Sequence, residues 1–210
     1  MLKRLLSSPA ILFLLLGNCY CIWYYQSHPD SFGTIVWIYW FQSVTIGLFN
    51  FLDLMTVENF DASGMKMNDG PVTKGNKGCA AWFFLVHYGM FHLVYGIFLI
   101  TGMYTQHAHV DKMILLLGVA TFFLETLFNF MRMKKLEKAM TMNLGVMFFL
   151  PYLRIVPMHL MILLPSFLGV KPSLLFLILK TGADILSYIL YHHIFAGKKP
   201  DEVPQASGSM

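Results

Sequence analysis

Six long apolar segments divide this chain, and they constrain its fold more than any other feature. They lie near residues 7–25, 33–55, 79–103, 112–132, 143–168 and 173–196. A helix that crosses a bilayer needs about 20 mostly apolar residues, and every segment meets that length. Charged residues make up only 12% of the chain, against roughly 25% in a soluble domain. The sequence therefore predicts an all-α, polytopic membrane protein, with six transmembrane helices forming one domain over residues 1–197.

The basic residues outside these segments indicate an orientation. Eleven of them fall before the first helix and after the second, fourth and sixth, whereas the alternate connections hold only Lys112 and Lys171. Because basic loops stay in the cytoplasm, both termini are predicted to be cytoplasmic, in a multi-pass protein of the inner membrane. Topology then explains the net charge of +4, and no nucleic-acid partner is expected.

The regions between and beyond the helices are polar. The longest connection, residues 56–78, is rich in Gly, Asn, Asp and Lys and predicts a mobile loop, and residues 198–210 have no apolar periodicity and predict a disordered tail. The expected partner is the lipid bilayer. A second copy of the chain, and a lipid-like or small-molecule ligand, remain open.

Ionisable side chains inside the predicted helices form a candidate polar cluster, because charge at mid-bilayer is costly and marks functional sites. At 1.5 Å per residue, three of these groups lie roughly 16–20 Å from the cytoplasmic face, two near 24 Å and two near 12 Å. In that order they are His92, Arg154 and Asp184; His159 and Lys180; His87 and Glu125.

Helical phase separates these groups further. Lys180 and Asp184 are four residues apart, so they are predicted to pair on one helix face. His87 and His92 are five apart, about 140° around the helix, so they do not share a face. Depth makes Glu125 the expected partner of His87, whereas His92 is the better candidate for a site shared between helices.

The fifth segment carries an arginine between two prolines. Pro151 and Pro157 bracket Arg154, and each proline frees a carbonyl one turn earlier. The pattern predicts a kinked helix that lines a polar region. The alternative is that Arg154 pairs with Glu125 or Asp184 and serves folding alone.

Three stretches carry a family resemblance. HYGMF at 87–91, PYLRIVPMHL at 151–160 and LKTGADILSYILYHH at 179–193 resemble the DUF6498 family, bacterial multi-span membrane proteins of unknown function. The resemblance spans the second to the sixth helix. It implies a multi-span fold and no particular activity.

One interpretation of the cluster is a metal-dependent membrane hydrolase. His92, His159 and Asp184 would supply the nitrogen and oxygen ligands that zinc prefers, and a zinc-bound water would attack a lipid-like substrate.

Three alternatives stay open. The charged residues of the cluster would suit a small transporter or proton relay. His87 or His92, together with His159, would suit a b-type haem with two axial histidines. The third alternative is a structural or assembly protein, in which the ionisable groups pair only to fix helix packing.

Overall fold

The computed structural model describes residues 18–20, 22–28, 32–62, 65–67, 70–106, 110–138, 141–157, 159–160 and 177–187. Three long helices dominate these residues: α3 (Phe32–Thr56), α4 (Lys77–Gln106) and α5 (Lys112–Glu137). They match the second, third and fourth predicted helices to within five residues at each end. None contains proline, so each backbone hydrogen-bond ladder runs uninterrupted.

All three helices are long and apolar enough to cross a membrane. Within the apolar stretch of α5, Lys112–Lys135, Met133 is buried, whereas none of residues 112–131 is. Leaving so much apolar surface in water would be costly, whereas lipid covers it readily. The large exposed apolar side chains of α5 are Met113, Leu116, Leu117, Phe123, Leu124, Phe128 and Met131.

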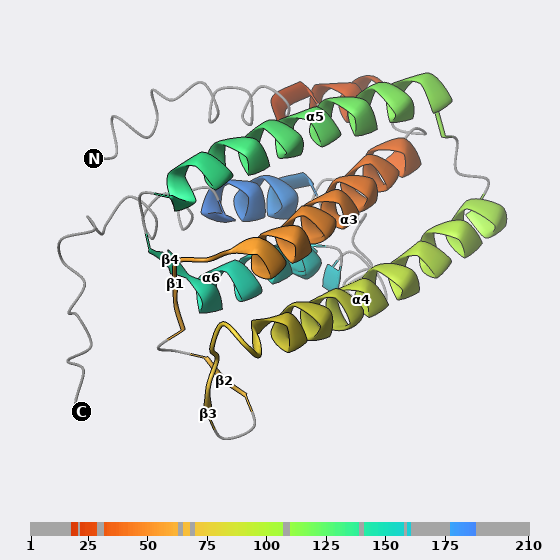
Figure 1. Cartoon of the computed structure of the whole chain (residues 1–210). Coiled ribbons are helices and arrows are strands. Elements are labelled where there is room, and N and C mark those ends of the chain that lie inside the picture. Colours follow the sequence, from red (N-terminus) through yellow and green to blue (C-terminus); the bar gives the residue numbers. More distant parts are fainter. Residues whose placement is uncertain are drawn as a thin grey trace, which may run out of the picture.

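Helix α3 lies between α4 and α5 (Figure 1). At one end, the backbone N–H of Asp111 donates to Thr34 Oγ1 at 2.9 Å, so α3 and α5 begin side by side. At the other end, Lys134 Nζ lies 3.2 Å from Asp53 Oδ1. These two contacts show that α3 and α5 run parallel. Helix α4, which comes between them in the sequence, runs in the opposite direction.

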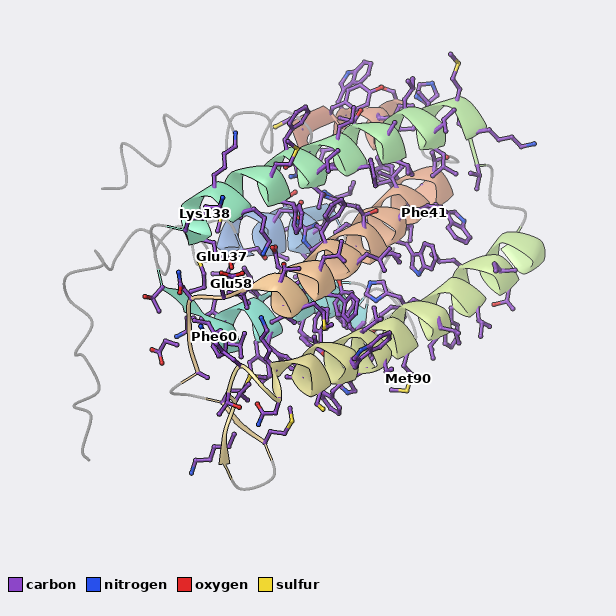
Figure 2. The ribbon with its side chains drawn as sticks, in the orientation of Figure 1. Phe41, Glu58, Phe60, Met90, Glu137 and Lys138 are labelled. Atoms are coloured by element: carbon purple, nitrogen blue, oxygen red, sulfur yellow. The ribbon has the colours of Figure 1, made fainter. Side chains whose placement is uncertain are left out.

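A group of charged residues gathers where α3 and α5 end. Lys134 Nζ lies 2.6 Å from Glu137 Oε2, and Glu137 Oε1 accepts a 2.8 Å hydrogen bond from the backbone N–H of Glu58. Figure 2 shows Glu58 and Glu137 beside each other at this end. Glu137 therefore ties the chain that leaves α3 to the last turn of α5.

The polar connection predicted as a loop contains short strands. β1 (Phe60–Asp61) pairs in parallel with β4 (Met142–Asn143), and β2 (Lys66–Met67) pairs antiparallel with β3 (Gly70–Pro71). The β1–β4 pairing joins the connection after α3 to the connection after α5. The loop is thus held at two places by main-chain pairing, which a polar composition does not reveal.

The fifth predicted helix changes character at its first proline. It starts as α6 (Leu144–Phe149), where the side chain of Asn143 caps the helix by accepting from the Val146 N–H at 3.0 Å. It then tightens into the 3₁₀ helix η2 (Leu150–Arg154), with Pro151 near its start, and helix resumes at 155–157 and 159–160. The helix type therefore changes at Pro151, because proline cannot donate to the α-helical ladder, and the kink itself stays a prediction.

The first and last predicted helices are described in part. Residues 18–20 and 22–27 are helical and run two residues past the end of the predicted 7–25 segment, and residues 177–187 are helical within 173–196. The remainder of these segments, part of 143–168 and the tail 198–210 lie outside the described residues. The fold is confirmed as mainly helical with three candidate membrane spans, whereas six spans and cytoplasmic termini stay predictions.

Candidate functional site

Three charged side chains of the predicted cluster meet in the interior, and we call them the ion triad: Arg154, Lys180 and Asp184. Lys180 Nζ lies 2.9 Å from Asp184 Oδ2, and Arg154 Nη2 lies 3.1 Å from Asp184 Oδ1. Asp184 is 2% exposed and Lys180 is 1% exposed. The predicted Lys180–Asp184 pair therefore forms, and Asp184 is the carboxylate with which Arg154 pairs.

An asparagine from the start of the described chain completes this network. The Asn18 amide Nδ2 donates to Asp184 Oδ2 at 3.3 Å, and its Oδ1 accepts from Lys180 Nζ at 2.8 Å and from Thr181 Oγ1 at 3.3 Å. Asn18 was missed from the sequence. The available signal was a single amide inside the apolar run ILFLLLGNCYC.

Aromatic side chains from two membrane-length helices flank the triad. Lys180 Nζ lies 5.4 Å from the ring centre of Tyr39 on α3 and 5.7 Å from that of Phe122 on α5, both within cation–π range. The Tyr39 hydroxyl also donates to the backbone carbonyl of Arg154 at 3.0 Å. The triad is thus built against both α3 and α5.

Several buried polar atoms near these helices have no hydrogen-bond partner among the described residues. In native proteins, nearly all buried polar atoms are paired, so each exception calls for an explanation. Arg154 Nη1 belongs to the triad itself, and Ser187 follows Asp184 by one helical turn. The other side-chain atoms concerned are Gln42 Oε1 and Asn50 Nδ2 on α3, and Asp184 Oδ1, which contacts Arg154 Nη2 as an ion pair and not as a hydrogen bond.

His92 belongs to a separate hydrogen-bonded chain between α3 and α4. Its Nδ1 lies 2.9 Å from the carbonyl of Tyr88, and its Nε2 lies 2.8 Å from Ser43 Oγ. Ser43 Oγ in turn lies 2.8 Å from the Tyr88 hydroxyl. All three side chains are buried.

The donor and acceptor chemistry of these groups gives this series of hydrogen bonds a direction. A carbonyl oxygen can only accept, so His92 Nδ1 carries a hydrogen, and in the neutral ring Nε2 accepts from the Ser43 hydroxyl. Ser43 Oγ then accepts from the Tyr88 hydroxyl, which shares its single hydrogen between Ser43 Oγ and the Ser43 carbonyl at 3.1 Å. Protonation of His92 would reverse the direction of its hydrogen bond to Ser43. We call Tyr88, Ser43 and His92 the donor chain; it ends at a buried imidazole, and its direction can reverse.

The other two histidines of the predicted cluster also contact hydroxyl groups. His87 Nδ1 lies 2.9 Å from the Tyr152 hydroxyl, and His159 Nδ1 contacts the Tyr95 hydroxyl. His87 therefore pairs with a phenol on η2 and not with Glu125, the partner that depth suggested. Depth alone cannot predict such pairs, because it ignores the direction in which each helix face points.

Glu125 stays at the margin of the candidate site. It is exposed on α5 and forms no ion pair with any residue that the structure describes. It still interacts electrostatically with Arg154, Asp184 and Lys180. Of the two carboxylates predicted as partners for Arg154, it is therefore the outer one.

The suggested metal ligands do not assemble into a metal site. Within the described ranges, no group of three or more His, Cys, Asp or Glu side chains could hold a metal ion. Both ring nitrogens of His92 are engaged with Tyr88 and Ser43, and His159 contacts Tyr95. The zinc interpretation of His92, His159 and Asp184 thus lacks a common centre, because the three engage different partners.

Comparisons with known proteins give a family but no characterised relative. No curated protein and no solved structure matches the chain. A family model does match, over residues 1–200, and it therefore covers nearly the whole sequence. The chain belongs to DUF6498, a family of unknown function.

Proposed function

We propose that this chain is a small proton-coupled transporter of the inner membrane, with six spans and both termini in the cytoplasm. The three membrane-length helices and the strong bias of basic residues between alternate connections support this arrangement. Consistent with it, the predicted cytoplasmic connections after α3 and after α5 pair through β1 and β4. The functional centre of the proposal is the ion triad.

The observation that carries the proposal is the burial of this triad among apolar helices. A buried charge costs several kcal/mol even after relaxation, so a triad kept for packing alone is an expensive solution. In membrane proteins such groups mark solute and proton pathways. Protonation of Asp184 would remove the negative charge of the triad and leave Arg154 and Lys180 without their shared counter-ion, which gives a physical switch between two packings.

The donor chain that ends at His92 favours coupling to protons. It links α3 to α4 through Tyr88, Ser43 and His92, and its hydrogen bonds can reverse direction when the imidazole gains a proton. Hydrolase and haem interpretations that use His92 gain no comparable support, because both of its imidazole nitrogens are already engaged. A purely structural role would explain the ion pairs but not the unpartnered Nη1 of Arg154.

Proton flux in liposomes tests the proposal. The purified protein is reconstituted with a pH-sensitive dye inside, and a potassium gradient with valinomycin imposes a membrane potential. Wild-type protein is expected to carry protons, and Asp184→Asn to lose that flux. Asp53→Asn is the matched control, because Asp53 also pairs with a lysine, at 3.2 Å from Lys134, but lies away from the triad.

A second variant separates the role of the carboxylate from the effect of unbalanced charge. The double variant Arg154→Gln/Asp184→Asn removes one charge of each sign, so the triad keeps its net charge. It is expected to fold and still to lose proton flux. Wild-type flux no higher than that of empty liposomes, or undiminished flux in a folded Asp184→Asn protein, would contradict the proposal.

A further inference from the structure

We propose that Arg154 binds a small monovalent anion at its free guanidinium nitrogen, and that a carboxylate group is the class of ligand that fits best. The inference rests on the proposed function and deepens it, because it names the solute that the same cluster would carry. It is drawn from the charge of the triad, from the hydrogen bonds already made there, and from one buried donor that lacks a partner.

The charges of the triad do not balance. Arg154 and Lys180 contribute two positive charges, and Asp184 contributes one negative charge to the same network. An uncompensated charge in a low-dielectric interior is strongly unfavourable unless a counter-ion approaches it. One monovalent anion would neutralise the site, whereas a divalent anion would leave it negative.

The donor groups already in use show where an anion would bind. The amine of Lys180 donates to Asn18 Oδ1 and Asp184 Oδ2 and faces the rings of Tyr39 and Phe122. Its donors therefore have little capacity for a further ligand. Lys180 contributes charge to the site and not a contact.

Arg154 has the remaining capacity. Its Nη2 lies 3.1 Å from Asp184 Oδ1, but its Nη1 is buried and has no hydrogen-bond partner in the part of the chain that the structure describes. Guanidinium N–H groups bind carboxylates through short, charge-assisted hydrogen bonds. The Ser187 hydroxyl, also buried without a described partner, lies one turn beyond Asp184 and offers a second donor on the same helix.

Glu125 is the rival counter-ion within the protein. It is exposed on α5 and lies within electrostatic range of Arg154, but no ion pair between them is formed. If its charge already neutralised the triad, an added anion would gain nothing. The variant Glu125→Gln distinguishes the two cases: it should leave anion binding nearly unchanged if the anion is the counter-ion, and it should create binding that the wild type lacks if Glu125 is the counter-ion.

Thermal unfolding of the full chain in detergent tests the inference, with sodium acetate as the probe and sodium sulfate at equal ionic strength as the divalent comparison. Acetate is expected to raise the Tm of the wild type saturably, since a ligand that binds only the folded state stabilises it. Arg154→Gln should abolish this response, and Arg154→Lys should weaken the apparent affinity about tenfold or more, because lysine lacks the planar donor pair. Lys134→Gln, which removes a cation paired elsewhere, is the matched control.

Arg154→Gln leaves Lys180 and Asp184 as a neutral pair, so it is expected to fold; should it not, Arg154→Lys and Ser187→Ala provide the test. The inference is overturned if acetate and sulfate act alike, if Arg154→Gln responds like the wild type, or if the wild type does not respond. If acetate does not raise the Tm but the Asp184-dependent proton flux is intact, the anion site alone is rejected. An intact acetate response without proton flux would reject the transporter alone.

Discussion

The ring of Tyr88 on α4 occupies the space that a side chain on Gly47 of α3 would need. A Cβ atom placed on Gly47 would lie 2.4 Å from Tyr88 Cε1, closer than real Cβ contacts allow. The same tyrosine donates to the Ser43 carbonyl at 3.1 Å and lies beside Ser43 Oγ. The close approach of these helices and the buried donor chain therefore depend on each other.

Gly47→Ala is expected to destabilise the protein by about 1–3 kcal/mol, because the added methyl group must displace a buried ring. Chemical or thermal unfolding in detergent measures the change. Gly89→Ala on α4 is the matched control, since a Cβ atom there meets nothing within 4 Å. Equal stability of the two variants would show that the α3–α4 contact is looser than described.

Ser43→Ala should cost about 1–3 kcal/mol, because it leaves the Tyr88 hydroxyl and His92 Nε2 buried with one partner fewer. It should also reduce proton flux in liposomes if the donor chain conducts. Thr45→Val removes another hydroxyl of α3, one that only donates to the Phe41 carbonyl within the same helix at 2.8 Å. If Ser43→Ala loses no more stability and no more proton flux than Thr45→Val does, the donor chain contributes little to either.

Glu137→Ala is expected to loosen the connection after α3. The backbone N–H of Glu58 donates to Glu137 Oε1 at 2.8 Å, so its amide hydrogen should exchange faster in the variant, as hydrogen-exchange mass spectrometry can measure. Glu58→Ala is the control, because it removes the exposed Glu58 side chain but keeps the backbone donor. Unchanged exchange in Glu137→Ala would show that β1 and β4 alone hold this segment.

The predicted topology can be tested by labelling single cysteines with a membrane-impermeant thiol reagent. On a background without the three native cysteines, Lys74→Cys should react only after the cells are opened, and Lys112→Cys in intact spheroplasts. Both positions are exposed on the protein, so only the membrane should limit the access of the reagent to them. Reaction of Lys74→Cys in intact spheroplasts would reverse the proposed orientation.

Local rules predicted much of the described fold. The bounds of α3, α4 and α5 follow from uninterrupted apolar runs, because a bilayer-spanning backbone must satisfy its hydrogen bonds within the helix. The Lys180–Asp184 pair follows from a spacing of one helical turn, and the tightening at Pro151 follows from a missing N–H group. Each of these features depends on residues that are neighbours along the chain.

The candidate site was predicted less completely, since its other contacts join segments far apart in the sequence. Depth correctly offered Asp184 as a partner for Arg154, but it also offered Glu125 for His87, which instead contacts Tyr152. Asn18 went unnoticed, because a single amide in an apolar run carries no period. The paired strands of the 56–78 connection were missed because strands of two residues are too short to show a period.

The sequence by itself determined a mainly helical chain with membrane-length segments, and it determined which ionisable groups those segments carry. Only the tertiary structure decided that Arg154 and Lys180 share Asp184, that His92 ends a donor chain through Ser43, and that Arg154 Nη1 is left without a described partner. The physical reason is that hydrophobic length and helical phase are properties of one segment. Ion pairs and buried hydrogen bonds between helices depend instead on the rotation and packing of several segments at once.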